Sequence, residues 1–375
     1  MRSSLSDRLS VALSALLIAA LCLGMFLVPK SDFSERENRA LAPLPSLRLS
    51  SLLRGELSSS LSDYYGDHFP LRTQFTACKA TVERWLGKRE NNGILFGKEG
   101  YLIPRDEYDS LAVARENLLS CQEFLGAQST TAKICILPRA VDVLNLYLPD
   151  GYDTERATSI HALTDELLPS ALSVTDTLRA AAEDGSYVWY KTDHHWTSDG
   201  AFLAYQTLAP SLGITPLSAD AFTPVTVSER FLGTSFSKSG LAKNPPDTVT
   251  LYRYENDERF EVYNEETQST RYGFYHTERL SEKDQYLVFL GGNFARLTVR
   301  DPDAENKPKM LLFKDSFANA MIPFLALHFD LDVIDLRYYQ GSVSELLTNN
   351  HYDQILLLMG ADTLATTPAW KKLNR

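Results

Sequence analysis

The chain has few cysteines, and their spacing excludes the usual structural roles. Only four of 375 residues are cysteine, and Cys22 lies in an apolar run, which leaves an odd number outside it. No C-x-x-C spacing occurs, so neither a disulfide framework nor a zinc site is expected. Cys121 and Cys135 could pair with each other; the alternative is that both are buried free thiols.

Positive charge is also in short supply. The chain has 37 Lys and Arg against 48 Asp and Glu, which gives a formal net charge of −11. Because nucleic acid backbones are anionic, this surplus argues against a nucleic acid partner and against basic, peripheral membrane binding. The apolar fraction of 44% and the aromatic fraction of 11% are typical of a globular protein rather than a disordered one.

One long apolar run lies near the N-terminus. Residues 9–28 carry no charge, and twenty helical residues span a hydrocarbon core of about 30 Å. Arg2 and Arg8 precede the run, which favours a cytoplasmic N-terminus. A cleaved signal peptide is the alternative, although its apolar core is usually shorter. We predict an uncleaved, single-pass anchor in the lipid bilayer of the cell membrane, with the bulk of the chain extracytoplasmic.

The rest of the chain indicates an α/β protein. We expect an anchor segment at 1–30, a linker with amphipathic helices at 31–90, broken near Pro70, and a large domain at 91–375. The large domain begins with a hairpin between the apolar runs 94–96 and 101–103.

Strands and helices then alternate, which favours a mostly parallel sheet with helices on both faces. The predicted strands are 132–137, 187–190, 309–313, 331–336 and 354–359. The predicted helices are 109–126, 155–183, 197–208, 317–329 and 343–347. Residues 215–300 interrupt this alternation with short Thr-, Val- and Tyr-rich runs, so we expect an inserted or appended β-rich segment there.

Two short motifs carry residue types suited to acyl transfer. Asp193 precedes His195 by two residues, so its carboxylate could bind the imidazole Nδ1–H and leave Nε2 as a base. Ser316 follows the strand predicted at 309–313 and opens a helix, where free backbone N–H groups can stabilise an oxyanion. A serine hydroxyl needs an adjacent base, and His195 would supply it. Asn293, after Gly291 and Gly292, could donate a further bond to the oxyanion.

Each of these residues also has a simpler interpretation. Ser316 could be only an N-cap, and Asp193 with His195 only a strand-end pair. Trp196 could stack on a sugar or brace the loop, and Arg337 could bind an anionic substrate or pair with a carboxylate. His194 and His195 with Asp193 could ligate a metal, but no further His or Cys follows at ligand spacing. We therefore predict neither a metal nor a cofactor.

The motifs resemble those of a known family. Asp193-His194-His195-Trp196 and, later, Asp315-Ser316-Phe317 resemble the DHHW family, which is similar to the SGNH-hydrolase-like domains of the alginate O-acetylation proteins. Further matching segments are residues 33–39, 67–72 and 96–102. The resemblance implies a flavodoxin-like SGNH core with Ser316 as nucleophile, His195 as base and Asp193 as its orienter. Lys314 departs from the glycine usual before Asp-Ser in SGNH hydrolases, which puts the oxyanion role of that turn in doubt.

These observations lead to two hypotheses of different classes. The first is a serine O-acetyltransferase or acetylesterase that acts on a cell-surface glycan. Since no acetyl-CoA is available outside the cell, the resemblance implies a multi-spanning membrane acyltransferase as the acetyl donor. The second is a catalytically silent polysaccharide-binding or assembly protein that uses the same groove.

Overall fold

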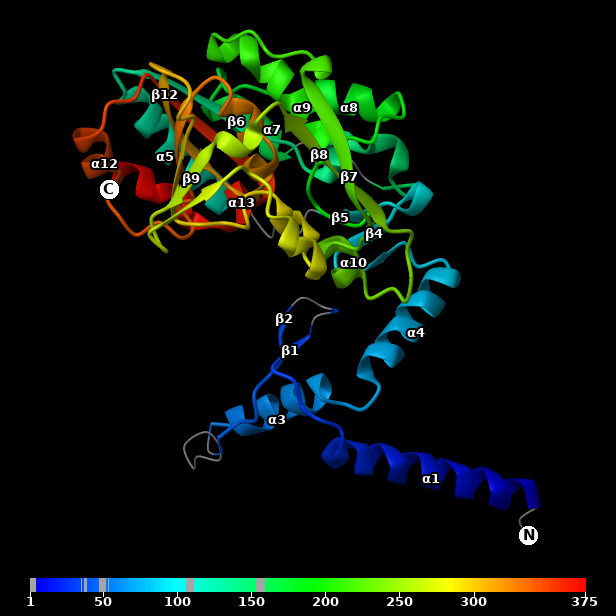
Figure 1. Ribbon diagram of the computed structural model, residues 1–375. Helices are drawn as coiled ribbons and strands as arrows, with labels where there is room; N and C mark the ends of the chain where they lie inside the picture. The colour runs from blue at the N-terminus through cyan, green and yellow to red at the C-terminus, as the bar shows by residue number, and fades with distance from the viewer. Residues whose placement is uncertain are drawn as a thin grey trace. The chain divides into compact units, whose positions relative to one another are not determined.

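The computed structural model describes residues 5–34, 36, 39–46, 52, 54–105, 111–152 and 159–375. Contacts divide the chain into two compact units, one of residues 1–88 with 240–243 and one of residues 89–239 with 244–375 (Figure 1). The first motif segment, 33–39, and the beginnings of the helices predicted at 109–126 and 155–183 lie partly outside the described residues. The division at residues 30 and 90 stays a prediction.

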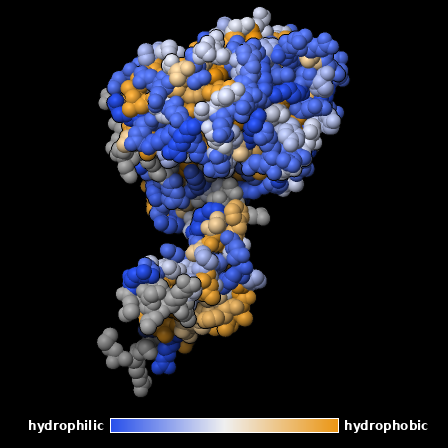
Figure 2. All heavy atoms as spheres, turned by 90° about the vertical axis from the view of Figure 1, so that its left-hand side faces the viewer, coloured by the Kyte–Doolittle hydropathy of each residue, from blue (hydrophilic) through white to orange (hydrophobic). Residues whose placement is uncertain are grey.

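The first unit begins with one long apolar helix. Helix α1 (Leu5–Leu27) is long and apolar enough to cross a membrane, by length and composition. Its apolar side chains are exposed, and Leu13 and Phe26 retain 62% and 86% of their accessible surface. Hydrophobic side chains gather over this unit in Figure 2, while most of the visible face of the second unit is hydrophilic. The remaining elements are strands β1 (Phe33–Ser34) and β2 (Arg39–Ala40) and helices α3 (Glu56–Asp67) and α4 (Arg72–Trp85).

The second unit is built on a mixed sheet of seven strands in the order β10-β9-β11-β13-β12-β14-β6. Strands β13, β12, β14 and β6 are mutually parallel, whereas β11 joins them antiparallel. The strand bounds are β6 Thr131–Leu137, β9 Glu261–Asn264, β10 Ser269–Tyr272, β11 Arg296–Arg300, β12 Lys309–Lys314, β13 Asp330–Ile334 and β14 Gln354–Gly360.

Helices cover both faces of this sheet, as the sequence predicted. Alternate side chains of β12 enter opposite cores: Met310 and Leu312 pack on one face, Leu311 and Phe313 on the other. Nearly every residue of β12 is buried, as expected of a strand covered on both faces. The first face is covered by α6 (Ala140–Val143), α8 (Thr175–Glu183), α9 (Ser198–Leu208) and α11 (Ile322–Leu325). The second is covered by α5 (Ala112–Gly126), α7 (Ser159–Leu167), α12 (Val343–Asn349) and α13 (Ala361–Thr366).

The β-rich segment predicted at 215–300 has two parts. Strands β7 (Phe222–Phe231) and β8 (Asp247–Tyr254) form a separate antiparallel pair, while β9, β10 and β11 extend the main sheet. The predicted hairpin is confirmed as β4 (Ile94–Phe96) and β5 (Leu102–Pro104), with β3 (Glu90–Asn91) on its edge.

Three predicted elements were wrong in detail. Residues 155–183 hold two helices, α7 and α8, because Pro169 lies between them. The helix predicted at 317–329 is only a 3₁₀ turn (Ser316–Ala320) and α11, since Pro323 cannot donate the next helical hydrogen bond. Residues 187–190 form no strand of the sheet; Trp189 instead forms a local bridge with Trp196.

Candidate active site

Ser316 is carried by the central part of the sheet. It follows β12, whose neighbours β13 and β14 are parallel to it, so Ser316 lies at the carboxyl ends of the strands, where ligands bind in α/β sheets. The preceding residue, Asp315, is fully buried. Its Oδ1 accepts from Phe317 N (3.1 Å) and its Oδ2 from Gly360 N (2.7 Å), which ties the turn to the end of β14. Ser316 itself is partly exposed.

The Asp193–His195 loop is held in place by side-chain and backbone hydrogen bonds. A buried carboxylate, Asp247, accepts hydrogen bonds from Lys191 N (2.7 Å), from Thr192 N (2.7 Å) and from the Tyr187 hydroxyl. It also accepts from Thr192 Oγ1 (2.5 Å). These four donors join the loop to the start of β8, and Leu102 N of β5 donates to Lys191 O (2.7 Å), so the loop is held by strands outside the main sheet. Beyond the loop, Thr197 caps α9 by accepting from Gly200 N (3.2 Å).

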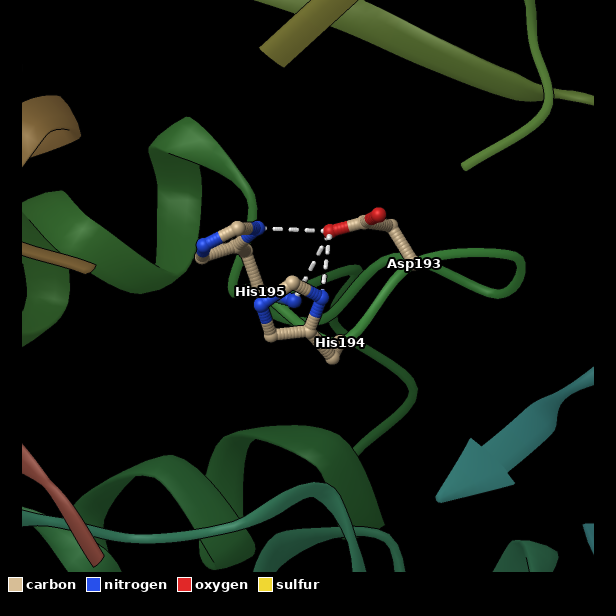
Figure 3. Close-up of side chains that lie close together, drawn as sticks. All are labelled: Asp193, His194 and His195. Carbon is tan, nitrogen blue, oxygen red and sulfur yellow. Dashed lines mark hydrogen bonds and ion pairs between the residues drawn. The ribbon is translucent and has the colours of Figure 1, made fainter. Parts of the chain in front are cut away.

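The structure brings Asp193, His195 and Ser316 together. His195 Nε2 lies 2.8 Å from Ser316 Oγ, and His195 Nδ1 lies 2.6 Å from Asp193 Oδ1. Figure 3 shows the second of these contacts and the proximity of His194. Both distances lie within the range of a nucleophile, its base and the group that orients the base. The three residues come from two segments 121 positions apart in sequence.

Asp193 is 1% exposed and is surrounded by donors. Its Oδ1 also accepts from His195 N (3.1 Å), and its Oδ2 accepts from Thr234 N (2.8 Å) and Thr234 Oγ1 (2.9 Å). Burial alone would raise the pKa of Asp193, but the nearby His194 and His195 and these hydrogen bonds hold it below its ordinary value. Asp193 is therefore an ionised acceptor, and His195 Nδ1 must carry the hydrogen. In the neutral imidazole, Nε2 is then the nitrogen with the free lone pair.

Two rings enclose the His195 imidazole. Tyr286 stacks parallel to it at 3.8 Å between centroids, with an interplanar angle of 2°. His194 lies against it at 3.8 Å and 39°. Tyr286 also donates its hydroxyl to the carbonyls of Ser316 (3.3 Å) and Phe317 (3.4 Å), so one side chain contacts both halves of the site.

The remaining predicted residues lie nearby in different settings. Trp196 is fully buried, and its Nε1 donates to Phe317 O (3.0 Å), an arrangement that braces the loop and leaves no face for a sugar. Arg337 donates to both oxygens of Asp335 (2.9 and 2.6 Å), so its charge is paired with a carboxylate.

Asn293 and Lys314 belong to one buried network. The Lys314 side chain is fully buried, and its Nζ donates to Asn293 Oδ1 (3.0 Å) and Asn319 Oδ1 (2.8 Å). Asn319 Nδ2 in turn donates to Asn293 Oδ1 (3.2 Å) and Gly292 O (3.2 Å). Burial lowers the pKa of Lys314 to about 8, against the opposing effect of Asp335, 3.7 Å away. Lys314 therefore points into the interior, where it binds Asn319, a residue of the Ser316–Ala320 turn.

This network fixes the loop after Val288. Residues Leu290, Gly291 and Gly292 all have positive φ (60°, 77° and 126°), a conformation that glycine adopts readily and leucine rarely does. Because Asn293 Oδ1 accepts two hydrogen bonds, its amide is held in one orientation with Nδ2 as the remaining donor.

Asp193, His194 and His195 also form a compact group of possible metal ligands, with their ligand atoms within 4.8 Å of one another. Their lone pairs are already engaged in part. Asp193 accepts four hydrogen bonds, and His195 binds it through Nδ1 and Ser316 through Nε2. The donor set therefore fits a hydrogen-bonded triad better than a metal centre.

Sequence reasoning missed Thr234, Asp247, Tyr286 and Asn319. Thr234 lies 41 residues from Asp193, Asp247 lies 55 residues from Thr192, and Tyr286 lies 91 residues from His195. No local sequence pattern marks any of the three. Lys314 did carry a signal, since a charged residue at the end of an apolar strand calls for a buried partner. The two cysteines that could have paired are both buried free thiols.

Comparisons with known proteins agree with this description. Residues 173–334 match the family model described as DHHW protein. The chain is 24% identical over 231 residues to the probable alginate O-acetylase AlgJ of Pseudomonas fluorescens, covering 57% of each protein. It is 24% identical over 193 residues to the same protein of Azotobacter vinelandii, covering 47% of this chain and 49% of that one. The chain thus spans about half the length of these relatives.

Two solved structures share the fold. A DHHW family protein from Eubacterium siraeum aligns with a TM-score of 0.61 and 22% identity, covering 76% of this chain and 96% of that one. PatB1 of Bacillus cereus, solved with a sulfonyl adduct, aligns with a TM-score of 0.60 and 19% identity, covering 75% and 100%. The predicted resemblance to the DHHW family and the predicted SGNH-like α/β fold are confirmed.

Proposed function

We propose that this chain is a serine acyl-transfer enzyme that moves acetyl groups on a polysaccharide outside the cytoplasm. The observation that carries the proposal is the continuous line of hydrogen bonds from Asp193 through His195 to Ser316. A buried, ionised carboxylate, a correctly oriented imidazole and a partly exposed serine are the parts that nucleophilic acyl transfer requires.

The proposed reaction has two steps. His195 Nε2 takes the proton of Ser316 as Oγ attacks the acetyl carbonyl, and the donor oxygen leaves with that proton, which gives an acetyl-serine. A sugar hydroxyl, or water, then loses its proton to His195 and attacks the acetyl-serine, and His195 returns that proton to Ser316 Oγ as it leaves. Asp193 stabilises the imidazolium in both steps.

Two donors are suited to the oxyanion of these steps. Ser316 is the first residue of its 3₁₀ turn, so its backbone N–H precedes the first helical hydrogen bond. Asn293 Nδ2 is the remaining donor of an amide whose oxygen is held by Lys314 and Asn319. Such donors are most effective when they are fixed before the charge develops.

The relatives support the choice of substrate and place of action. AlgJ is named as a probable alginate O-acetylase, so a glycan is the proposed acceptor here. Helix α1 would act as a single-pass anchor that keeps the catalytic domain at the extracytoplasmic membrane surface. A multi-spanning acyltransferase in the same membrane would deliver the acetyl group.

The test uses the full chain in detergent, as wild type and as Ser316→Ala, with a chromogenic acetyl ester. We expect hydrolysis by the wild type and a loss of at least ~10³-fold in Ser316→Ala, with the fold intact by circular dichroism. If neither protein hydrolyses the ester while the wild type binds glycans, the catalytically silent binding protein becomes the better explanation.

A further inference from the structure

A pocket of about 440 Å³ is lined in part by His194. Its walls include His194, Thr234, Ser235, Lys238 and Asp362. Asp362 lies two residues beyond the end of β14, and β14 is hydrogen-bonded to the strand that carries Ser316. The pocket is therefore at the same edge of the sheet as the triad, and its volume is typical of small-molecule sites.

The hydrogen bonds around His194 determine its tautomer. Thr234 Oγ1 gives its only hydrogen to Asp193 Oδ2 (2.9 Å), so at its 2.6 Å contact with His194 Nδ1 it must accept. His194 Nδ1 therefore carries a hydrogen. Burial and the neighbouring His195 lower the pKa of His194 to about 4, so the ring is neutral near pH 7. Its Nε2 is then a hydrogen-bond acceptor on a side chain that is 35% exposed.

The other walls supply complementary groups. Lys238 is an exposed cation on α10 (Thr234–Ser239) with three donors. The Ser235 hydroxyl is 1% exposed and has no hydrogen-bond partner among the described residues. Arg105, which pairs with Glu90 at 2.9 Å, and Asp362 complete a lining of mixed polarity. Hydrogen-bond donors and acceptors within a lining of mixed polarity suit a sugar, which carries hydroxyl groups on an apolar ring.

We propose that this pocket is the acceptor subsite, in which a sugar residue donates a hydroxyl hydrogen to His194 Nε2 and accepts from Lys238. The proposal rests on the proposed function, since it names where that enzyme holds its glycan. His194 is then a binding residue for a hydroxyl that is not the attacking one, and His195 stays the base. The two adjacent histidines hold the same tautomer because both ultimately bond to Asp193, one directly and one through Thr234.

The test compares acetyl transfer with ester hydrolysis in the full chain. His194→Phe keeps an aromatic ring against His195 but removes the acceptor nitrogen, and Lys238→Met removes the cation at similar length. The matched control is Lys371→Met, which removes a surface lysine paired with Glu116. Acceptors are a mannuronate hexamer and cellohexaose. We expect each pocket variant to raise the acceptor KM about five- to tenfold, the loss of one hydrogen bond, and by more than any change in ester hydrolysis.

Equal losses in transfer and hydrolysis for His194→Phe would mean that His194 only braces His195, and unchanged acceptor KM values in both variants would also overturn the proposal. To separate this from failure of the proposed function, both acceptors are titrated calorimetrically into Ser316→Ala protein. Binding that is weakened five- to tenfold by Lys238→Met supports the subsite even without turnover. Binding that the variant leaves unchanged, or no binding of either hexamer, removes it.

Discussion

Ser316 is carried by the sheet, whereas Asp193 and His195 lie on a loop that no strand of the sheet supports. The serine half of the site, Ser316 with its turn, directly follows β12. One carboxylate, that of Asp315, joins this turn to β14. The histidine half of the site, the loop with Asp193 and His195, is held by two carboxylates. Asp247 accepts four hydrogen bonds and Asp193 accepts four more. The geometry of the candidate site is thus held by the main sheet on one side and largely by two buried carboxylates on the other.

The largest effect is expected at Asp193, the residue of the loop that binds the proposed base, His195. In Asp193→Asn, the side-chain NH₂ would face a ring or hydroxyl donor, and the favoured His195 tautomer would place its hydrogen on the wrong nitrogen. We expect kcat for acetyl-ester hydrolysis to fall on the order of 10⁴-fold with the fold retained. The exposed Asp199→Asn is the matched control. A kcat within tenfold of the wild type would show that Asp193 does not orient the His195 imidazole.

The second effect tests the serine half. Lys314→Met removes the cation that holds Asn293 Oδ1 and Asn319 Oδ1, so the Asn293 amide loses its fixed orientation. We expect kcat to fall ~10²-fold with little change in KM, the effect of losing one oxyanion donor. Steady-state kinetics of Lys314→Met, Asn293→Ala and the double variant measure this.

The double variant decides what Lys314 does. If Lys314 acts through Asn293, the double variant should be no worse than Asn293→Ala alone, because the two changes remove one function. Losses that multiply would instead assign Lys314 an independent role and would separate it from the oxyanion site.

The third prediction concerns stability rather than rate. In Asp247→Asn, the new NH₂ group would face donors on the loop, because all four partners of this carboxylate donate. An unsatisfied buried donor costs about 1–3 kcal/mol, and we expect a loss of that size in the free energy of unfolding, measured by denaturant titration. Asp199→Asn again serves as the control, with a change below ~0.5 kcal/mol. Equal stability of the two variants would mean that the loop is held by other contacts.

The same contrast explains which parts of the site the sequence could predict. The position of Ser316 at the sheet edge could be predicted because a buried strand has a recognisable apolar run. Asp193 and His195 were found through their two-residue spacing, although the strand assumed before them does not exist. Thr234 and Asp247 were missed because a hydrogen bond across 41 or 55 residues leaves no periodic trace. The segment after Ser316 is shorter than the predicted helix because Pro323 has no N–H to continue the helical hydrogen bonds.

The smallest predicted effect concerns pH and lies on the histidine half. Burial and the charge of Asp193 raise the pKa of Asp284 to about 6, with His194 opposing and Glu282 adding to the rise. The folded state therefore holds a proton that the unfolded chain releases near pH 4, so this carboxyl's contribution to stability is lost as the pH rises through 6. Asp284→Asn keeps the acceptor for Tyr286 N and cannot ionise. We expect its Tm to exceed that of the wild type by roughly 2–4 °C at pH 7 and to match it near pH 4. A Tm difference that does not change between these pH values would show that the pKa of Asp284 is the same in the folded and unfolded states, so that burial and Asp193 do not raise it.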